Sequence, residues 1–82
     1  MDLNYTGDSS ERLPVASHLN DFEYKVLMQT YIKHNSVMGL RERSKYTLSR
    51  IVKVERNLED NCLDVHYENG EWWKYYPNYI WG

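Results

Sequence analysis

Reactive side chains alternate along one short stretch of this sequence. Cys62, Asp64 and His66 are each two residues apart, which on a β-strand places them on one face at intervals of roughly 6–7 Å. A histidine oriented by a carboxylate is a common general base. Along an extended strand, however, the row is too stretched for a hydrogen bond between the thiol and the imidazole, and no serine stands beside it. We therefore expect no catalytic residue and predict that the chain is not an enzyme.

The same stretch is a poor metal site. Cys62 and His66 are four residues apart, a spacing that brings two ligands together on a helix but separates them by about 13 Å on a strand. His18 and His34 have no ligands near them in the sequence, whereas a zinc site needs four ligands, usually in close pairs. The four glycines are scattered and form no phosphate-binding loop. We expect neither a metal nor a cofactor.

A hairpin signature predicts the element that holds these residues. Asn69-Gly70 separates two runs of alternating polarity, and this pair favours a type I′ turn because both of its central residues need positive φ. A two-residue turn here predicts that Tyr67 faces Trp72 across the hairpin. The expected core face then holds Leu63, Val65, Tyr67, Trp72 and Tyr76, with Lys74 as its only charge. The opposite face holds Cys62, Asp64, His66, Trp73 and Tyr75.

A helix is predicted from about residue 20 to residue 37. Asn20 is a good N-cap, and Glu23 stands where it completes a capping box. The apolar residues fall on two sides of this helix, with Tyr24, Leu27, Met28 and Tyr31 on one side and Phe22 and Val26 on the other. A helix that is apolar on two sides lies deep in a fold or contacts a second body. A homodimer formed through this helix is therefore one expectation.

Together these elements predict an α+β fold, with one N-terminal helix packed on a three-stranded antiparallel meander. Period-two alternation predicts the first strand over residues 47–56, with Val52 and Val54 on one face and Ile51 on the other. Strong coiling would curl the sheet into a small, SH3-like, partly open barrel, a resemblance of shape alone. The chain after Pro77 can add a fourth edge strand. Residues 1–16 are predicted as a flexible acidic tail and residues 17–82 as a single domain.

The composition is that of one small folded domain. The chain has 82 residues, of which 41% are hydrophobic and 15% aromatic, which argues against intrinsic disorder. Its single cysteine cannot form an internal disulfide, as expected in a reducing compartment. No apolar run approaches the roughly 18 residues that a membrane-spanning helix needs, and the start lacks the pattern of a signal peptide. We predict a cytoplasmic protein without a membrane association.

The net charge of -2 conceals three blocks. Residues 1–24 hold five acids and one base, residues 25–57 hold eight bases and two acids, and residues 58–82 hold five acids and one base. Either the blocks neutralise one another in the folded chain, or one of them leaves a surface of a single sign for a charged partner.

The acidic third block coincides with the aromatic hairpin. Seven of the last sixteen residues are aromatic, and tyrosine and tryptophan dominate the energetically important contacts of protein interfaces. We therefore favour a protein-binding module with an aromatic face, rimmed by acids, that suits a partner with a basic surface. The predicted partner-binding residues are Asp64, His66, Glu68, Glu71, Trp73, Tyr75 and Trp81.

Two further expectations concern the role and the partner. A compact chain of this kind is similar in composition to the small accessory proteins of phages and mobile elements, many of which inhibit a host protein. The alternative is a small β-barrel that binds single-stranded nucleic acid through the basic second block, with aromatic side chains as stacking platforms. Its predicted contacts are Arg41, Arg43, Lys45, Arg50, Lys53 and Arg56.

Overall fold

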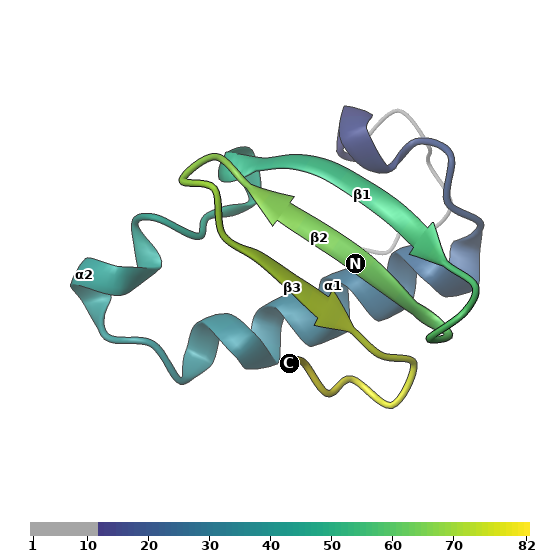
Figure 1. The fold of residues 1–82 in the computed structure, drawn as a ribbon. Helices are drawn as coiled ribbons and strands as arrows, with labels where there is room; N and C mark the ends of the chain where they lie inside the picture. The colour runs from purple at the N-terminus through teal and green to yellow at the C-terminus, as the bar shows by residue number, and fades with distance from the viewer. Residues whose placement is uncertain (1–11) are drawn as a thin grey trace, which may run out of the picture.

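The computed structural model describes residues 12–82 and shows the predicted α+β fold. One long helix packs on one face of a three-stranded antiparallel sheet with the strand order β1-β2-β3 (Figure 1). The sheet is open and does not close into a barrel. The elements in chain order are η3 (Pro14–Ala16), α1 (Asp21–Ser36), α2 (Leu40–Arg43), η4 (Leu48–Arg50), β1 (Ile51–Asn57), β2 (Cys62–Tyr67) and β3 (Trp72–Tyr75).

Helix α1 begins where the sequence predicts. The Asn20 side chain accepts a hydrogen bond from the Glu23 amide at 2.7 Å, and the Glu23 carboxylate accepts one from the Asn20 amide at 2.8 Å. This capping box satisfies backbone donors that the first turn leaves without partners. The predicted division of the apolar residues into two sides is only partly right, because Val26 is buried together with Leu27 whereas Phe22 is 60% exposed. The stripe that packs on the sheet is Val26, Leu27, Thr30 and His34.

The β2–β3 hairpin has a different register from the predicted one. His66 pairs with Trp72 rather than with Trp73, because the connection is a three-residue loop. The Tyr67 amide donates to the Glu71 carbonyl at 2.8 Å, and of the Asn-Gly pair only Gly70 has a positive φ, 91°. These features belong to a type I turn followed by one left-handed residue.

This shift of one residue moves every β3 side chain to the opposite face of the sheet. Tyr75 is completely buried and Trp73 packs against the core, whereas the sequence placed both on the outer face. Trp72 is 50% exposed, although it was predicted in the core. Lys74 lies with Trp72 on the face turned away from α1.

Strand β1 contains a bulge that the alternating pattern did not predict. Its pairing with β2 shifts between Ile51 and Lys53, so that Val52 is the extra residue. A bulge resets the alternation of side chains. Ile51 and Val54 are therefore both buried and Val52 is 51% exposed, whereas the alternation had placed Val54 with Val52 and Ile51 on the other face.

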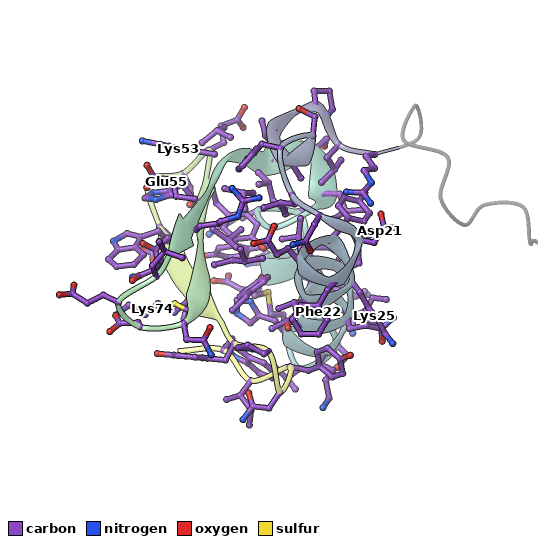
Figure 2. The ribbon with its side chains drawn as sticks, turned by 90° about the vertical axis from the view of Figure 1, so that its right-hand side faces the viewer. Asp21, Phe22, Lys25, Lys53, Glu55 and Lys74 are labelled. Atoms are coloured by element: carbon purple, nitrogen blue, oxygen red, sulfur yellow. The ribbon has the colours of Figure 1, made fainter. Side chains whose placement is uncertain are left out.

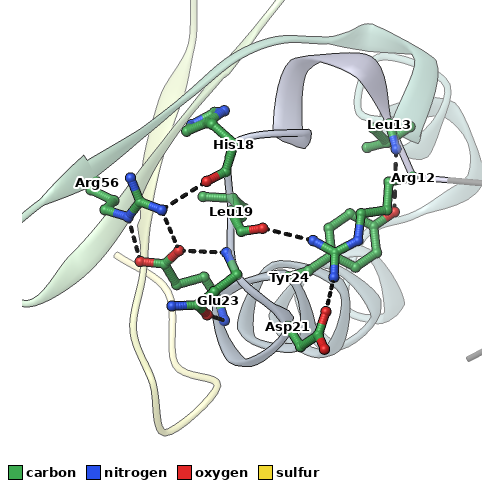
Figure 3. Close-up of polar contacts among 9 residues, drawn as sticks. Arg12, Leu13, His18, Leu19, Asp21, Glu23, Tyr24 and Arg56 are labelled. Atoms are coloured by element: carbon green, nitrogen blue, oxygen red, sulfur yellow. Dashed lines mark hydrogen bonds and ion pairs between the residues drawn. The ribbon is translucent and has the colours of Figure 1, made fainter. Parts of the chain in front are cut away.

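Both ends of the described chain pack against the sheet and α1. Of the predicted tail, residues 1–11 lie outside the described residues, but Ala16 is fully buried in the core. Arg56 of β1 binds the Glu23 carboxylate and the His18 carbonyl, which ties the N-terminal segment to the sheet (Figure 3). After Pro77 the chain returns beside β3 as predicted, with one bridge between Tyr75 and Trp81.

Candidate functional site: the outer sheet face

One face of the sheet carries no covering element in the described part of the chain. In Figure 2 the sheet and the helix form two layers, and Lys53, Glu55 and Lys74 point away from the helix. We call this surface the outer sheet face. Its residues are Val52, Lys53, Glu55, Asp64, His66, Trp72 and Lys74.

Trp72 is the largest exposed side chain on the outer sheet face. It pairs with His66 across the strands, and the two rings stack with their centroids 5.6 Å apart and an angle of 18° between their planes. The imidazole therefore covers one face of the indole. Trp72 remains 50% exposed in spite of this stack.

The charges on this face are mostly paired. The Lys53 ammonium lies 3.1 Å from the Glu55 carboxylate, and Lys74 binds Asp60 in the β1–β2 turn. The hydrogen bond from Lys53 lowers the pKa of Glu55, and the bond from Lys74 lowers the pKa of Asp60. Both carboxylates are therefore ionised at neutral pH, and both lysines are held toward the β1–β2 turn.

Asp64 differs from these carboxylates because its partners are uncharged. It accepts hydrogen bonds from the Asn57 amide at 3.3 Å and from the Cys62 thiol at 3.7 Å. Among residues 12–82, no cation pairs with Asp64. Its charge therefore remains on the outer sheet face.

The structure separates the predicted partner-binding residues into three groups. Asp64 and His66 lie on the outer sheet face, as predicted. Glu68 and Glu71 are exposed in the β2–β3 loop, where Glu68 forms an ion pair with Arg50. The third group, Trp73, Tyr75 and Trp81, lies on the opposite side around His34.

His34 is a central residue that the sequence did not single out. It is 3% exposed, and its Nδ1 is 2.9 Å from the Tyr75 hydroxyl. The Trp81 ring stacks on its imidazole at 5.0 Å, and Trp73 meets it edge-on at 4.7 Å. Burial lowers the pKa of His34. The sequence did carry one signal for this burial. His34 follows Thr30 by four residues, which places both side chains on the same, buried face of α1.

Cys62, Asp64 and His66 lie along β2. Burial, followed by the nearby Asp64 charge, raises the pKa of Cys62 to about 11, so the thiol is almost entirely protonated at neutral pH and is a poor nucleophile. The His66 Nε2 lies 3.6 Å from Glu55 and is not hydrogen-bonded to Asp64. The described residues therefore place no nucleophile beside a base in this row.

Most cations of the predicted nucleic-acid surface make contacts within the chain. Arg43 donates to carbonyls at the end of α1, at 3.0 and 3.1 Å, and Arg56 holds Glu23. Arg50 and Lys45 each lie beside a glutamate. These contacts leave the basic block largely neutralised by carboxylates or engaged with backbone carbonyls.

A groove of about 220 Å³ lies between the start of α1 and the β1–β2 turn. Its lining includes Phe22 and Leu58, which are 60% and 87% exposed. Two polar residues of its wall, Glu23 and Arg56, bind each other. The groove thus combines exposed apolar side chains with a charged pair whose members bind each other.

Within residues 12–82, no helix is long and apolar enough to cross a membrane. The same residues contain no group of three His, Cys, Asp or Glu side chains placed to hold a metal ion. The chain has no significant match among known protein families, curated proteins or solved structures.

Proposed function

We propose that this chain is a small, non-enzymatic binding module that attaches to another protein through its outer sheet face. The observation that carries this proposal is the position of Trp72, which is half exposed on a sheet face that no described element covers. Exposing an indole to water is unfavourable, and burying it in an interface recovers that free energy. Tryptophan is also among the residues that most often dominate protein interfaces.

The charges around Trp72 support a protein as the partner. The half-exposed side chains of Trp72 and Val52 lie at one end of this face, and the paired lysines and carboxylates lie toward the other end. Protein interfaces likewise combine apolar contacts with a polar rim. The unpaired Asp64 favours a partner with a basic surface. In this proposal Trp72 replaces Trp73 and Tyr75 as the main aromatic contact with the partner. Asp64 and His66 stay among the proposed partner-binding residues.

Affinity capture from the native host, followed by mass spectrometry, tests this function. We expect Trp72→Ala to fold like the parent chain and to lose the partner. Leu58→Ala is the matched control, since it removes an exposed apolar side chain of the β1–β2 turn that lines the groove beside α1 and lies at the opposite end of the sheet from Trp72. We expect it to retain the partner. Capture that survives Trp72→Ala would show that the outer sheet face is not the binding site.

Three finer parts of the proposal need separate measurements. Inhibition of a host protein, in the manner of phage accessory proteins, predicts that the captured partner loses activity when the module is added. A cytoplasmic location predicts that the module is recovered in the cytosolic fraction. A homodimer formed through α1, where Phe22 is exposed, predicts a dimer mass in light scattering at high micromolar concentration.

Single-stranded nucleic acid remains the alternative ligand class. That function predicts binding to an oligonucleotide that weakens steeply as salt is added. Arg41 is the clearest test residue, because the described residues give it no ion pair. An affinity that is undetectable at low salt, or that is unaffected by Arg41→Ala, would remove this alternative.

A further inference from the structure

The free face of the Trp72 indole is an electron-rich surface. Because His66 covers one face of the ring, a partner can stack only on the other. An aromatic face attracts cations and planar groups, and the arginine guanidinium is both. This geometry restricts which chemical group of a partner can stack on Trp72.

The two lysines nearest to Trp72 are held away from it. Lys74 is two residues further along β3, but its ammonium binds Asp60 at the opposite end of the sheet. Lys53 flanks His66 on β1, and its ammonium is held by Glu55. Neither lysine therefore repels a cation placed over the indole.

Two carboxylates that form no salt bridge among the described residues lie near Trp72, and Lys74, which stands directly across from Asp64, binds Asp60 instead. Asp64 stands diagonally across from Trp72 on the same face, since it is two residues from His66, and such neighbours have Cα atoms about 7–8 Å apart. Glu71 precedes Trp72 in the chain and is exposed. Among residues 12–82 neither carboxylate is paired with a cation. Their charges attract a guanidinium and repel a phosphate.

We propose that the outer sheet face recognises an arginine side chain of the partner protein, whose guanidinium stacks on the free face of Trp72 and is attracted by the nearby charges of Asp64 and Glu71. This inference rests on the proposed function, because it names the chemistry of the partner at the same site. The guanidinium contacts the π-face of the indole, and the two carboxylates favour its positive charge without contacting it. An oligonucleotide would place phosphates beside Asp64 and Glu71.

A peptide series measures this recognition directly. The probe is a flexible Gly/Ser peptide with arginine at alternate positions, and it is compared with the same peptide carrying citrulline, which keeps the shape but lacks the charge. Binding is followed by the indole N–H resonance of Trp72, assigned by its absence in Trp72→Phe. We expect the arginine peptide to bind about three- to tenfold more tightly than the citrulline peptide.

Matched variants assign that preference to the two residues. Asp64→Asn keeps the side-chain shape and should reduce the arginine preference by about two- to threefold. Glu59→Gln removes an exposed charge in the β1–β2 turn, away from Trp72, and should leave the preference unchanged. Trp72→Ala should abolish it, and circular dichroism of each variant confirms that the fold is retained.

The outcomes separate this inference from the proposed function. Equal affinity for the arginine and citrulline peptides would overturn the inference even if host capture depends on Trp72. A failed capture together with a clear arginine preference would overturn only the proposed function. Tighter binding of an oligodeoxythymidine at the Trp72 resonance would overturn both in favour of nucleic acid.

Discussion

The Nδ1 atom of His34 and the hydroxyl of Tyr75 are joined by a hydrogen bond of 2.9 Å inside the core, although the two residues are 41 positions apart in the chain. The Tyr75 hydroxyl is in turn 2.6 Å from the Tyr67 hydroxyl. One polar chain thus connects α1, β3 and β2. Because its members are buried, each of them depends on the others for a hydrogen-bond partner.

His34 should make the stability of the fold sensitive to mild acid. Burial lowers the pKa of His34 below its ordinary value of about 6.5, so the unfolded chain takes up a proton at a higher pH than the folded chain. Stability is therefore fully present above about pH 6.5 and is lost as the pH falls toward the folded-state pKa. Urea unfolding between pH 7.5 and pH 5 should show a midpoint that falls with pH.

The variant His34→Gln isolates this contribution. It retains a side chain that can hydrogen-bond to Tyr75 but cannot titrate, so its unfolding midpoint should vary less between pH 7.5 and pH 5 than that of the parent chain. His18 and His66 are present in both proteins and cancel in the comparison. Identical pH dependence in the two proteins would show that His34 does not control the acid response.

Removal of the Tyr75 hydroxyl should lower the free energy of unfolding, because this hydroxyl is shared by His34 and Tyr67. Tyr75→Phe leaves the His34 Nδ1 and the Tyr67 hydroxyl without their shared partner, and a buried polar group without a partner costs about 1–3 kcal/mol. Tyr76→Phe is the control, because the Tyr76 hydroxyl makes no hydrogen bond among the described residues. Urea unfolding should show a clear loss of stability for the first variant and little change for the second.

The fold class follows from signals that are local in the sequence. The capping box at Asn20 and Glu23 determines where α1 begins, and alternating polarity over residues 62–67 determines β2. Neither signal depends on contacts with distant residues, and both predictions were confirmed. The bulge at Val52 was not predicted, although the consecutive apolar residues Ile51 and Val52 interrupt the alternation there.

The composition of the outer sheet face depended on the turn type. An Asn-Gly pair fits a two-residue type I′ turn, and it also fits the last two positions of the three-residue loop seen here. The two loops differ by one residue in register, and this difference decides whether Trp72 or Trp73 is exposed. His34 was missed for another reason, since its partners Tyr75 and Trp81 come from the far end of the chain.

The three-residue loop makes a prediction about Gly70. Its φ of 91° is rarely adopted by other residues, so Gly70→Ala should destabilise the chain by about 1–2 kcal/mol. Gly39→Ala is a matched control, because an added Cβ meets no atom within 4 Å at either glycine and Gly39 has an ordinary φ of -70°. Thermal unfolding should distinguish the two variants; equal midpoints would contradict the assigned loop conformation.

The two adjacent tryptophans should respond oppositely to truncation. Trp73 packs against the core and meets His34 edge-on, so Trp73→Ala should cost several kcal/mol, about 3–5 for a large aromatic residue. Trp72 is half exposed, so Trp72→Ala should cost about 1 kcal/mol or less, mainly from its stack on His66. The predicted two-residue turn requires the reverse order of stability, because it places Trp72 in the core. Urea unfolding of both variants therefore tests the hairpin register, and a larger loss for Trp72→Ala would also remove Trp72 from the binding surface.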